Sequence, residues 1–187
     1  VNSGHLGELL SVQGSFTVHI PYDPEDRVFK PELAGGAMLD LGVYVATFAV
    51  DFLGVPDEVA ARGSTFPNGV DSDVEMIFSY HDNSRFASLT CALNAVGPER
   101  MVVTGTSGWA ELGPHFNHAS TLRINETGVV PKEYHQELEG HGYTYEIREA
   151  TRLIEAGQTE SDVLPLDRTL AVQELMADAL AQIDAPP

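Results

Sequence analysis

The sequence predicts an α+β fold, in which an open and mostly antiparallel β-sheet carries its helices on one face. Several short segments alternate apolar and polar side chains and are joined by turns rather than by helices. Only three segments place apolar residues at helical spacing, residues 33–54, 143–156 and 166–183. Strands that follow one another through turns favour an antiparallel sheet.

The first strand is expected at residues 10–20, where Val12, Phe16 and Val18 share one parity and polar residues share the other. An irregular connection rich in proline and acidic residues follows, with Arg27 and Lys30 in it. The longest apolar segment, residues 33–54, is expected to be a helix that ends at Gly54, with a proline two positions beyond.

The rest of the sheet is expected to consist of an edge strand and three hairpins. Turn residues such as Asn83-Ser84, Ser107-Gly108 and Thr127-Gly128 separate the alternating segments. The edge strand is residues 58–66, and the paired strands are residues 73–80 with 85–93, 99–106 with 109–112, and 121–125 with 129–137.

The two C-terminal helices, closed by Gly157 and introduced by Pro165 respectively, are amphipathic and are expected to cover the same face of the sheet as residues 33–54. The other strand parity still contains apolar residues, among them Ile77, Phe86 and Val103. This is more apolar surface than a solvated face requires, so a homodimer through the uncovered sheet face is predicted.

Composition excludes several classes of function. At 187 residues with 43% hydrophobic residues, the chain suits one domain with a substantial core. A net charge of −18 excludes a nucleic-acid-binding surface, which needs a basic patch.

Asp40, Thr47 and Asp51 interrupt the longest apolar run, which argues against a membrane span. Cys91 is the single cysteine, so no intrachain disulfide is possible and a cytoplasmic location is expected.

The helix at residues 33–54 carries the strongest candidate chemistry. Gly36, Asp40 and Tyr44 are spaced by four residues, so they stack on one helix face about 6 Å apart along the axis. A carboxylate and a phenol would project beside the Gly35-Gly36 pair, where a ligand could approach the backbone closely. A structural alternative stays open, in which the glycines form a turn, Asp40 complements the helix dipole and Tyr44 packs in the core.

The stretch AGGAMLDLGVY, residues 34–44, resembles the motif that opens the longest helix in the C-terminal domain of one oxidoreductase family. This is the glucose-fructose oxidoreductase, inositol dehydrogenase and rhizopine-catabolism oxidoreductase family. Its pattern is a glycine pair, then Asp, Gly and finally His or Tyr. Tyr44 in the last place resembles the branch with glucose-fructose oxidoreductase and the dimeric dihydrodiol dehydrogenases. The resemblance runs from HLGELLSVQGSF near the start through HGYTYE to the closing helices.

The resemblance implies an NAD(P)-dependent dehydrogenase or reductase acting on a sugar-like or diol substrate. Tyr44 would be the acid/base, and Asp40 would accept a substrate hydroxyl or orient a catalytic lysine. In the family that lysine belongs to a Glu-Lys-Pro motif on an N-terminal Rossmann domain, which also binds the cofactor. The resemblance further makes Gly35, Gly36, Arg27, Lys30 and His141 candidate substrate or cofactor contacts. Solvated loop cations for Arg27 and Lys30, and a polar turn residue for His141, are the alternatives.

No GxGxxG follows a strand in this sequence, and no GxxxxGK[ST] occurs. Residues 1–187 are therefore expected to form the substrate-binding and oligomerisation domain, without the N-terminal Rossmann domain. NAD or NADP would be bound by the full-length protein, whereas this chain alone is expected to bind no cofactor and to be inactive.

Two further alternatives bear on function. His115-x-x-His118 has a spacing that could bind zinc, but it lies in a loop-like segment without a second cysteine or an HExxH helix, so no metal site is expected. The competing function is a non-catalytic ligand-binding or dimerisation module of the same fold. The presence of both Asp40 and Tyr44 at the motif positions favours the enzyme.

Overall fold

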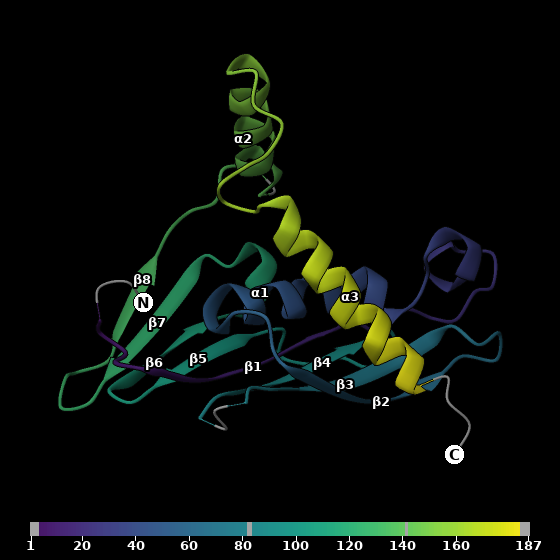
Figure 1. Ribbon diagram of the computed structural model, residues 1–187, viewed down its shortest axis with the longest axis horizontal. Helices are drawn as coiled ribbons and strands as arrows, with labels where there is room; N and C mark the ends of the chain where they lie inside the picture. The colour runs from purple at the N-terminus through teal and green to yellow at the C-terminus, as the bar shows by residue number, and fades with distance from the viewer. Residues whose placement is uncertain (1–3, 82–83, 141, 184–187) are drawn as a thin grey trace.

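The computed structural model describes residues 4–81, 84–140 and 142–183, and its dominant element is an eight-stranded sheet (Figure 1). The strands lie in the order β2-β3-β4-β1-β5-β6-β7-β8. Their bounds are β1 Leu9–Thr17, β2 Glu58–Thr65, β3 Asp71–Ser79, β4 Phe86–Ala92, β5 Met101–Gly105, β6 Gly108–Leu112, β7 Thr121–Glu126 and β8 Lys132–His135. The predicted α+β fold, the edge strand and the three hairpins are confirmed.

The first strand lies in the middle of the sheet, between β4 and β5. It pairs with β4 in parallel and with β5 in antiparallel orientation, and every other pair of neighbouring strands is antiparallel. Val12 is opposite Ala87 on one side and Val103 on the other. Alternate residues face the same side of a strand. The row formed by Val12, Ala87 and Val103, together with the residues two positions before and after each of them, therefore forms the buried face.

Two helices cover that face. The helix α1 (Val43–Leu53) packs on β1 and β4, and α3 (Leu166–Ile183) packs on β2 and α1. At the edge strand, the side-chain amide of Gln182 accepts a hydrogen bond from the Ala61 N–H (2.9 Å) and donates one to the Val59 carbonyl (2.8 Å). The free edge of β2 is therefore partly paired by a side chain of α3, which blunts it as a template for other strands.

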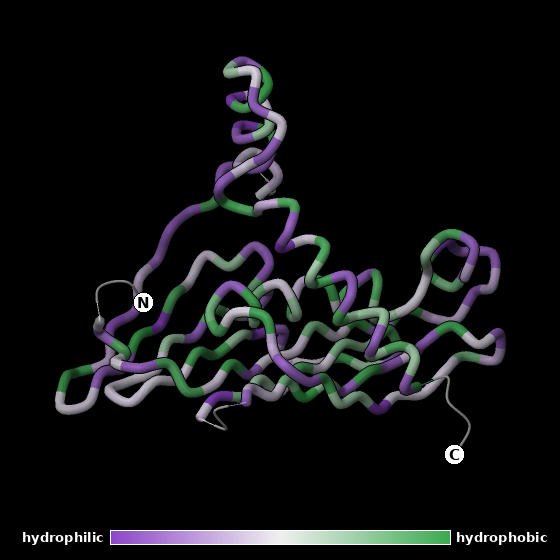
Figure 2. Tube along the Cα trace, in the orientation of Figure 1, coloured by the Kyte–Doolittle hydropathy of each residue, from purple (hydrophilic) through white to green (hydrophobic). Residues whose placement is uncertain are grey.

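The helix α2 (Tyr143–Glu155) forms where the sequence predicts a helix but does not cover the sheet. None of its residues is buried, and it projects away from the sheet on the side that carries α1 and α3 (Figure 1). Hydrophobic and hydrophilic residues alternate along this arm (Figure 2). Helical periodicity predicts an apolar face, but it does not say which surface that face meets.

The structure also corrects the prediction that Val103 lies on the uncovered sheet face. It is only 2% exposed and lies on the helix-covered face, whereas Ile77 and Phe86 are 42% and 45% exposed. The pairing of Val103 with the buried Val12 places its side chain in the core. The uncovered face therefore carries Ile77 and Phe86 but not Val103.

The predicted helix at residues 33–54 consists of three consecutive pieces. A 3₁₀ turn at Pro31–Leu33 precedes the glycine pair, a π-helical turn covers Met38–Gly42, and α1 then runs to Leu53. Gly54 ends the helix with a φ of 82°, and its carbonyl accepts a hydrogen bond from the Tyr80 hydroxyl (2.9 Å). The segment Pro31–Leu53 has the length and hydropathy of a membrane span, but half of its most apolar window is buried inside the domain, as in a core helix.

The start of this helix is fixed by a buried carboxylate. Asp71, at the first position of β3, accepts a hydrogen bond from the Met38 N–H (2.6 Å). Gly36 has a φ of 117°, and a Cβ atom there would lie 2.0 Å from Oδ1 of Asp71. Glycine is therefore required at position 36 by both conformation and space.

Candidate functional site

Asp40 lies in the π-helical turn and is paired with Arg27. One guanidinium nitrogen of Arg27 donates to Asp40 Oδ1 at 2.5 Å, and this hydrogen bond raises the pKa of Arg27 above its already high usual value. Arg27 belongs to a 3₁₀ turn, Arg27–Phe29, in the proline-rich connection. The structure thus brings together two of the predicted site residues that are 13 positions apart in the chain.

Tyr44 lies one turn further along the same helix. Its side chain is half exposed (46%), and its ring packs edge-on against Phe16 of β1, with 5.3 Å between the ring centres. Among the residues that the structure describes, none makes a hydrogen bond with the Tyr44 hydroxyl. Phe16 therefore fixes the ring from one side, while the phenol oxygen is free to meet a ligand.

A pocket of about 410 Å³ opens beside Tyr44. Its walls come from α1, from the end of β6, from the 3₁₀ turn Phe116–His118 and from the segment that leads into α3. The lining is mainly apolar, with a few polar groups, as in sites for small organic molecules. It consists of Val43, Tyr44, Thr47, Phe48, Asp51, Leu112, Phe116, Asn117 and Leu164.

The aromatic wall of this pocket is held by a chain of ring contacts. Phe116 packs edge-on against Phe16 (5.6 Å between ring centres) and against Phe48 (6.0 Å). The Phe116 N–H also donates to the Glu99 carbonyl (3.0 Å). These contacts place Phe116, from a loop more than 70 residues beyond Tyr44, at the same pocket.

The carboxylate of Asp51, another residue of the pocket lining, already has a partner. Arg168 of α3 donates to it at 2.5 Å and also bonds the Val163 carbonyl at 3.3 Å. Among the polar lining groups, the Tyr44 hydroxyl is thus better placed than Asp51 to receive a ligand. Tyr80 is unsuited to proton exchange, because burial raises its pKa to about 12.

The glycine pair is closely packed against the chain itself. A Cβ atom at Gly35 would lie 2.7 Å from the Val28 carbonyl oxygen and 2.8 Å from the Lys30 nitrogen. The backbone N–H groups of Gly35 and Gly36 donate to the Lys30 and Val28 carbonyls, both at 2.9 Å. The pair therefore has a structural role, and a contact with a ligand stays a prediction.

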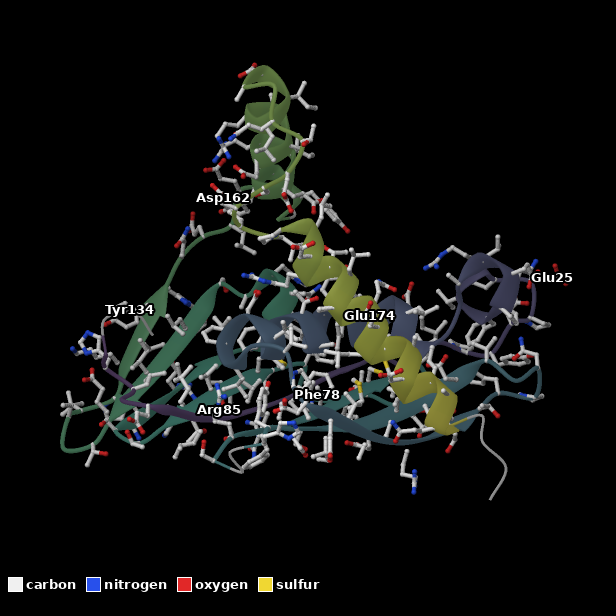
Figure 3. The ribbon with its side chains drawn as sticks, in the orientation of Figure 1. Glu25, Phe78, Arg85, Tyr134, Asp162 and Glu174 are labelled. Carbon is white, nitrogen blue, oxygen red and sulfur yellow. The ribbon has the colours of Figure 1, made fainter. Side chains whose placement is uncertain are left out.

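The structure gives less support to the other candidate contacts. Lys30 donates to Glu25 at 3.0 Å, a hydrogen bond that raises the pKa of Lys30, so its ammonium group is paired within the connection (Figure 3, where Glu25 is labelled). His141 lies outside the described residues. Its neighbour Gly142 adjoins the pocket loop, since a Cβ atom there would lie 3.6 Å from the Cβ atom of His118.

His115 and His118 are stacked, with 5.3 Å between ring centres, and His115 Nδ1 lies 2.5 Å from a carboxylate oxygen of Glu99. Within residues 4–81, 84–140 and 142–183 no three His, Cys, Asp or Glu side chains are grouped so that they could hold a metal ion. The two histidines therefore contribute a ring contact and a hydrogen bond to the pocket loop, and the absence of a metal site stays a prediction.

Sequence reasoning did not predict the pocket lining other than Tyr44. Phe116, Asn117 and Leu164 lie in irregular segments without periodicity, and nothing local marks them as neighbours of Tyr44. A cis peptide bond between Gly113 and Pro114 and the left-handed backbone of His115 (φ 58°) shape the loop that carries Phe116. Neither feature can be inferred from the spacing of apolar residues.

A model of the GFO/IDH/MocA C-terminal domain matches residues 1–111, well over half of the chain. The chain belongs to this oxidoreductase family. Trans-1,2-dihydrobenzene-1,2-diol dehydrogenase of Bos taurus is 30% identical over 189 residues, covering 96% of this chain and 54% of the relative. D-xylose 1-dehydrogenase (NADP(+)) 2 of Haloferax volcanii is 30% identical over 162 residues, covering 84% of this chain and 49% of the relative.

Solved structures share the fold. A 3-ketoreductase from Actinomadura kijaniata, in complex with NADP and TDP-benzene, superimposes with a TM-score of 0.82 at 19% identity over 97% of this chain and 56% of that protein. Aldose-aldose oxidoreductase from Caulobacter crescentus, complexed with glycerol, superimposes with a TM-score of 0.79 at 20% identity. The match covers 97% of this chain and 55% of that protein. This chain spans about half the length of the curated relatives it matches.

Proposed function

We propose that this chain is the substrate-binding domain of an NAD(P)-dependent oxidoreductase, in which Tyr44 is the general acid/base for hydride transfer to or from a sugar-like or diol substrate. The observation that carries the proposal is the position of the Tyr44 hydroxyl. It has no hydrogen-bond partner among the described residues, and Tyr44 is one of the residues that line a pocket, in a chain that belongs to a family of oxidoreductases. The Tyr44 hydroxyl is therefore interpreted as ligand-directed.

The proposed role requires a proton to move as a hydride moves. When a hydroxyl is oxidised, a base removes its proton, and in the reverse direction an acid returns it. The bound nicotinamide supplies or accepts the hydride. A phenol has a pKa near 10 in water, so a nearby positive charge is needed for this role at neutral pH. The lysine that the family resemblance implies, carried by the cofactor-binding domain, would provide that charge.

Asp40 and Arg27 are proposed to position groups next to Tyr44. The Arg27 guanidinium uses one N–H to hold Asp40 Oδ1, which fixes the carboxylate while its second oxygen can still accept a hydrogen bond. That oxygen would receive a substrate hydroxyl or the catalytic lysine. Direct contacts of Arg27, Lys30, Gly35, Gly36 and His141 with substrate or cofactor are part of the same proposal.

The pocket supports a substrate with one apolar face and several hydroxyl groups. Phe48, Phe116 and Leu164 offer apolar surface, and Tyr44 and Asn117 offer polar groups. A ring that carries neighbouring hydroxyls, such as a sugar or a cyclic diol, matches this division. The relatives named above as dihydrodiol and xylose dehydrogenases are consistent with it.

The cofactor is proposed to be held outside these 187 residues. No phosphate-binding glycine loop of the G-x-G-x-x-G type occurs in the sequence, and the pyrophosphate of a dinucleotide requires such a loop at a helix N-terminus in a Rossmann domain. The 187-residue chain alone would then be inactive and bind no NAD(P).

A cytoplasmic location stays a prediction. The alternative function, a non-catalytic module of the same fold, requires the Tyr44 hydroxyl to be dispensable.

Replacing Tyr44 by Phe in the full-length protein should reduce turnover roughly 10²- to 10⁴-fold and change substrate binding much less, because only the proton-transferring group is lost. Steady-state kinetics with trans-1,2-dihydrobenzene-1,2-diol or D-xylose and NADP⁺ would measure this. Tyr22→Phe is the matched control, since Tyr22 also packs edge-on against a phenylalanine, Phe29 (5.1 Å). Asp40→Asn should reduce turnover less and shift the pH–rate profile towards lower pH, since Arg27 is left uncompensated.

A Tyr44→Phe enzyme that keeps most of its turnover would rule out the acid/base role and favour the non-catalytic module. Equal losses in Tyr44→Phe and Tyr22→Phe would point to a general effect of removing a hydroxyl group. Thermal unfolding of both variants would separate that effect from lost stability.

Leu164→Trp should obstruct the pocket and raise the substrate KM on the order of tenfold, with little change in folding stability because Leu164 is exposed. Leu166→Trp, two residues further on and also exposed but outside the pocket lining, is the matched control and should leave KM unchanged. If both variants have the wild-type KM, the substrate does not bind in this pocket.

The domain is further proposed to form a homodimer through the uncovered sheet face, where Ile77 and Phe86 are exposed. Ile77→Asp combined with Phe86→Asp should convert a dimer into a monomer in light scattering at tens of micromolar protein. Leu170→Asp, at an exposed leucine of α3 on the helical side, should leave the dimer intact. A wild-type mass equal to that of a monomer would overturn the proposal.

A further inference from the structure

Leu164 lines the pocket of Tyr44 from the connection between α2 and α3, residues 156–165, which is called the return segment here. This segment runs back along α2 and leads into α3 (Figure 1). The side chain of Leu164 is 45% exposed, and that of its neighbour Val163 is 73% exposed. Since little apolar surface is buried at this point, the position of this part of the wall depends on polar contacts.

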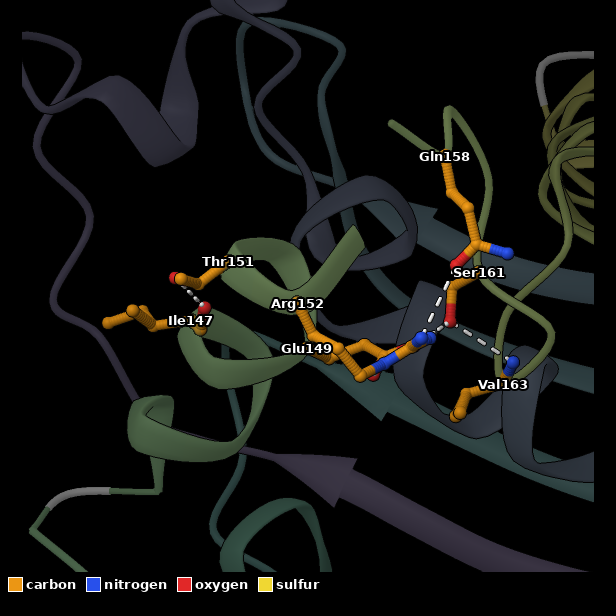
Figure 4. Close-up of polar contacts among 7 residues, drawn as sticks. All are labelled: Ile147, Glu149, Thr151, Arg152, Gln158, Ser161 and Val163. Carbon is orange, nitrogen blue, oxygen red and sulfur yellow. Dashed lines mark hydrogen bonds and ion pairs between the residues drawn. The ribbon is translucent and has the colours of Figure 1, made fainter. Parts of the chain in front are cut away.

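The first set of polar contacts holds the return segment to α2 (Figure 4). The Ser161 hydroxyl donates to Glu149 at 2.7 Å and accepts a hydrogen bond from the Val163 N–H at 3.1 Å. Two guanidinium nitrogens of Arg152 also donate to Glu149, both at 2.9 Å. The bonds from Arg152 and Ser161 lower the pKa of Glu149 to about 2, so this acceptor stays ionised at neutral pH.

Arg168 connects the same segment to the pocket. One of its guanidinium nitrogens donates to Oδ1 of Asp51 at 2.5 Å and to the Val163 carbonyl at 3.3 Å. Val163 precedes Leu164 in the chain, and Asp51 belongs to α1 and to the pocket lining. The Arg168 side chain therefore bridges the wall formed by Leu164 and the helix that carries Tyr44.

Both ends of this bridge rest on elements that are fixed by the core. The backbone of Arg168 lies in the first turn of α3, and its partner Asp51 lies near the end of α1. The two helices pack against each other and against the sheet. Each helix buries several apolar side chains, which are Val172, Leu175, Met176 and Ala179 in α3 and Val45, Ala46, Ala49, Val50 and Leu53 in α1.

We infer that Arg168 is a positioning residue for substrate binding, which holds Leu164 at the pocket by joining the Val163 carbonyl to Asp51. The inference rests on the proposed function, because it takes this pocket as the substrate site. Arg168 is not part of the pocket lining and acts through Leu164. Its loss should weaken substrate binding and leave the proton transfer at Tyr44 unchanged.

The variant Arg168→Met of the full-length protein should raise the substrate KM about three- to tenfold and leave kcat within about twofold. Steady-state kinetics with trans-1,2-dihydrobenzene-1,2-diol or D-xylose and NADP⁺ would measure this. Met and Arg have similar helix propensities, so α3 should keep its stability. Arg148→Met is the matched control and should leave KM unchanged, since Arg148 donates to Glu139 (2.6 Å) outside the pocket lining.

A double-mutant cycle with Leu164→Ala separates positioning from other effects. In the Leu164→Ala background, Arg168→Met should change KM by less than about twofold, because the side chain that Arg168 holds in place is already removed. A general loss of stability, or the uncompensated charge of Asp51, would instead add to the effect of Leu164→Ala. Additive effects on KM would therefore overturn the inference, as would a wild-type KM in Arg168→Met.

Hydrogen–deuterium exchange gives a readout that does not depend on activity. The N–H groups of Val163 and Leu166 donate to Ser161 and to the Glu160 carboxylate at 3.1 and 2.5 Å. Both amides should exchange on the order of threefold faster in Arg168→Met than in the wild type, and at the wild-type rate in Arg148→Met.

Equal exchange in Arg168→Met and the wild type would overturn the inference, because the return segment would then keep its position without Arg168. Faster exchange in a protein that lacks oxidoreductase activity would support the positioning of Leu164 by Arg168 and refute the proposed function. The two failures are therefore distinguishable.

Discussion

The arrangement of the site depends on one buried carboxylate, Asp71, and on the absence of a side chain at Gly36. The first N–H groups of a helix have no partner within the helix and must be paired by other groups. Asp71 pairs the Met38 N–H, and its oxygen occupies the space that a Cβ atom of residue 36 would fill. Since Asp71 is the first residue of β3, this contact attaches the start of the long helix to the sheet.

The same turn arranges the groups proposed to act on substrate. Hydrogen bonds from Gly35 and Gly36 to the carbonyls of residues 30 and 28 bring the preceding connection against the helix start, where Arg27 reaches Asp40. One turn later, Phe16 of the central strand packs against Tyr44. Tyr44 thereby packs against the central strand and also lines the pocket. Preorganised groups of this kind are what acid/base catalysis requires.

Much of the fold could be predicted from sequence because it depends on local patterns. Alternation identified the strands, turn residues identified the hairpins, and Gly54 marked the helix end. The position of β1 between β4 and β5 could not be predicted, since it depends on pairing between segments about 75 residues apart. Val103 and α2 were misplaced for a related reason: periodicity defines two faces of an element but not which face meets the core.

The residues of the candidate site also fall into those that could be predicted from the sequence and those that could not. Asp40 and Tyr44 are close in sequence and could be recognised together, with the family resemblance supplying their roles. Arg27 was predicted as a ligand contact, and its pairing with Asp40 emerges only in three dimensions. Phe116 and Leu164 reach the pocket through a loop and a return segment whose paths no local rule specifies. The least predictable parts of the site are thus those contributed by irregular segments.

The dependence of the site on the contact between Gly36 and Asp71 is tested most directly by Gly36→Ala. Urea denaturation should give a loss of at least about 3 kcal/mol in unfolding free energy, because the variant combines an unfavourable φ with a Cβ atom in contact with a buried carboxylate. Gly69→Ala, at a φ of 87° with no atom within 4 Å of the added Cβ, should lose only about 1–2 kcal/mol. Equal losses in the two variants would contradict the account, because the space occupied by Asp71 would then contribute nothing beyond backbone strain.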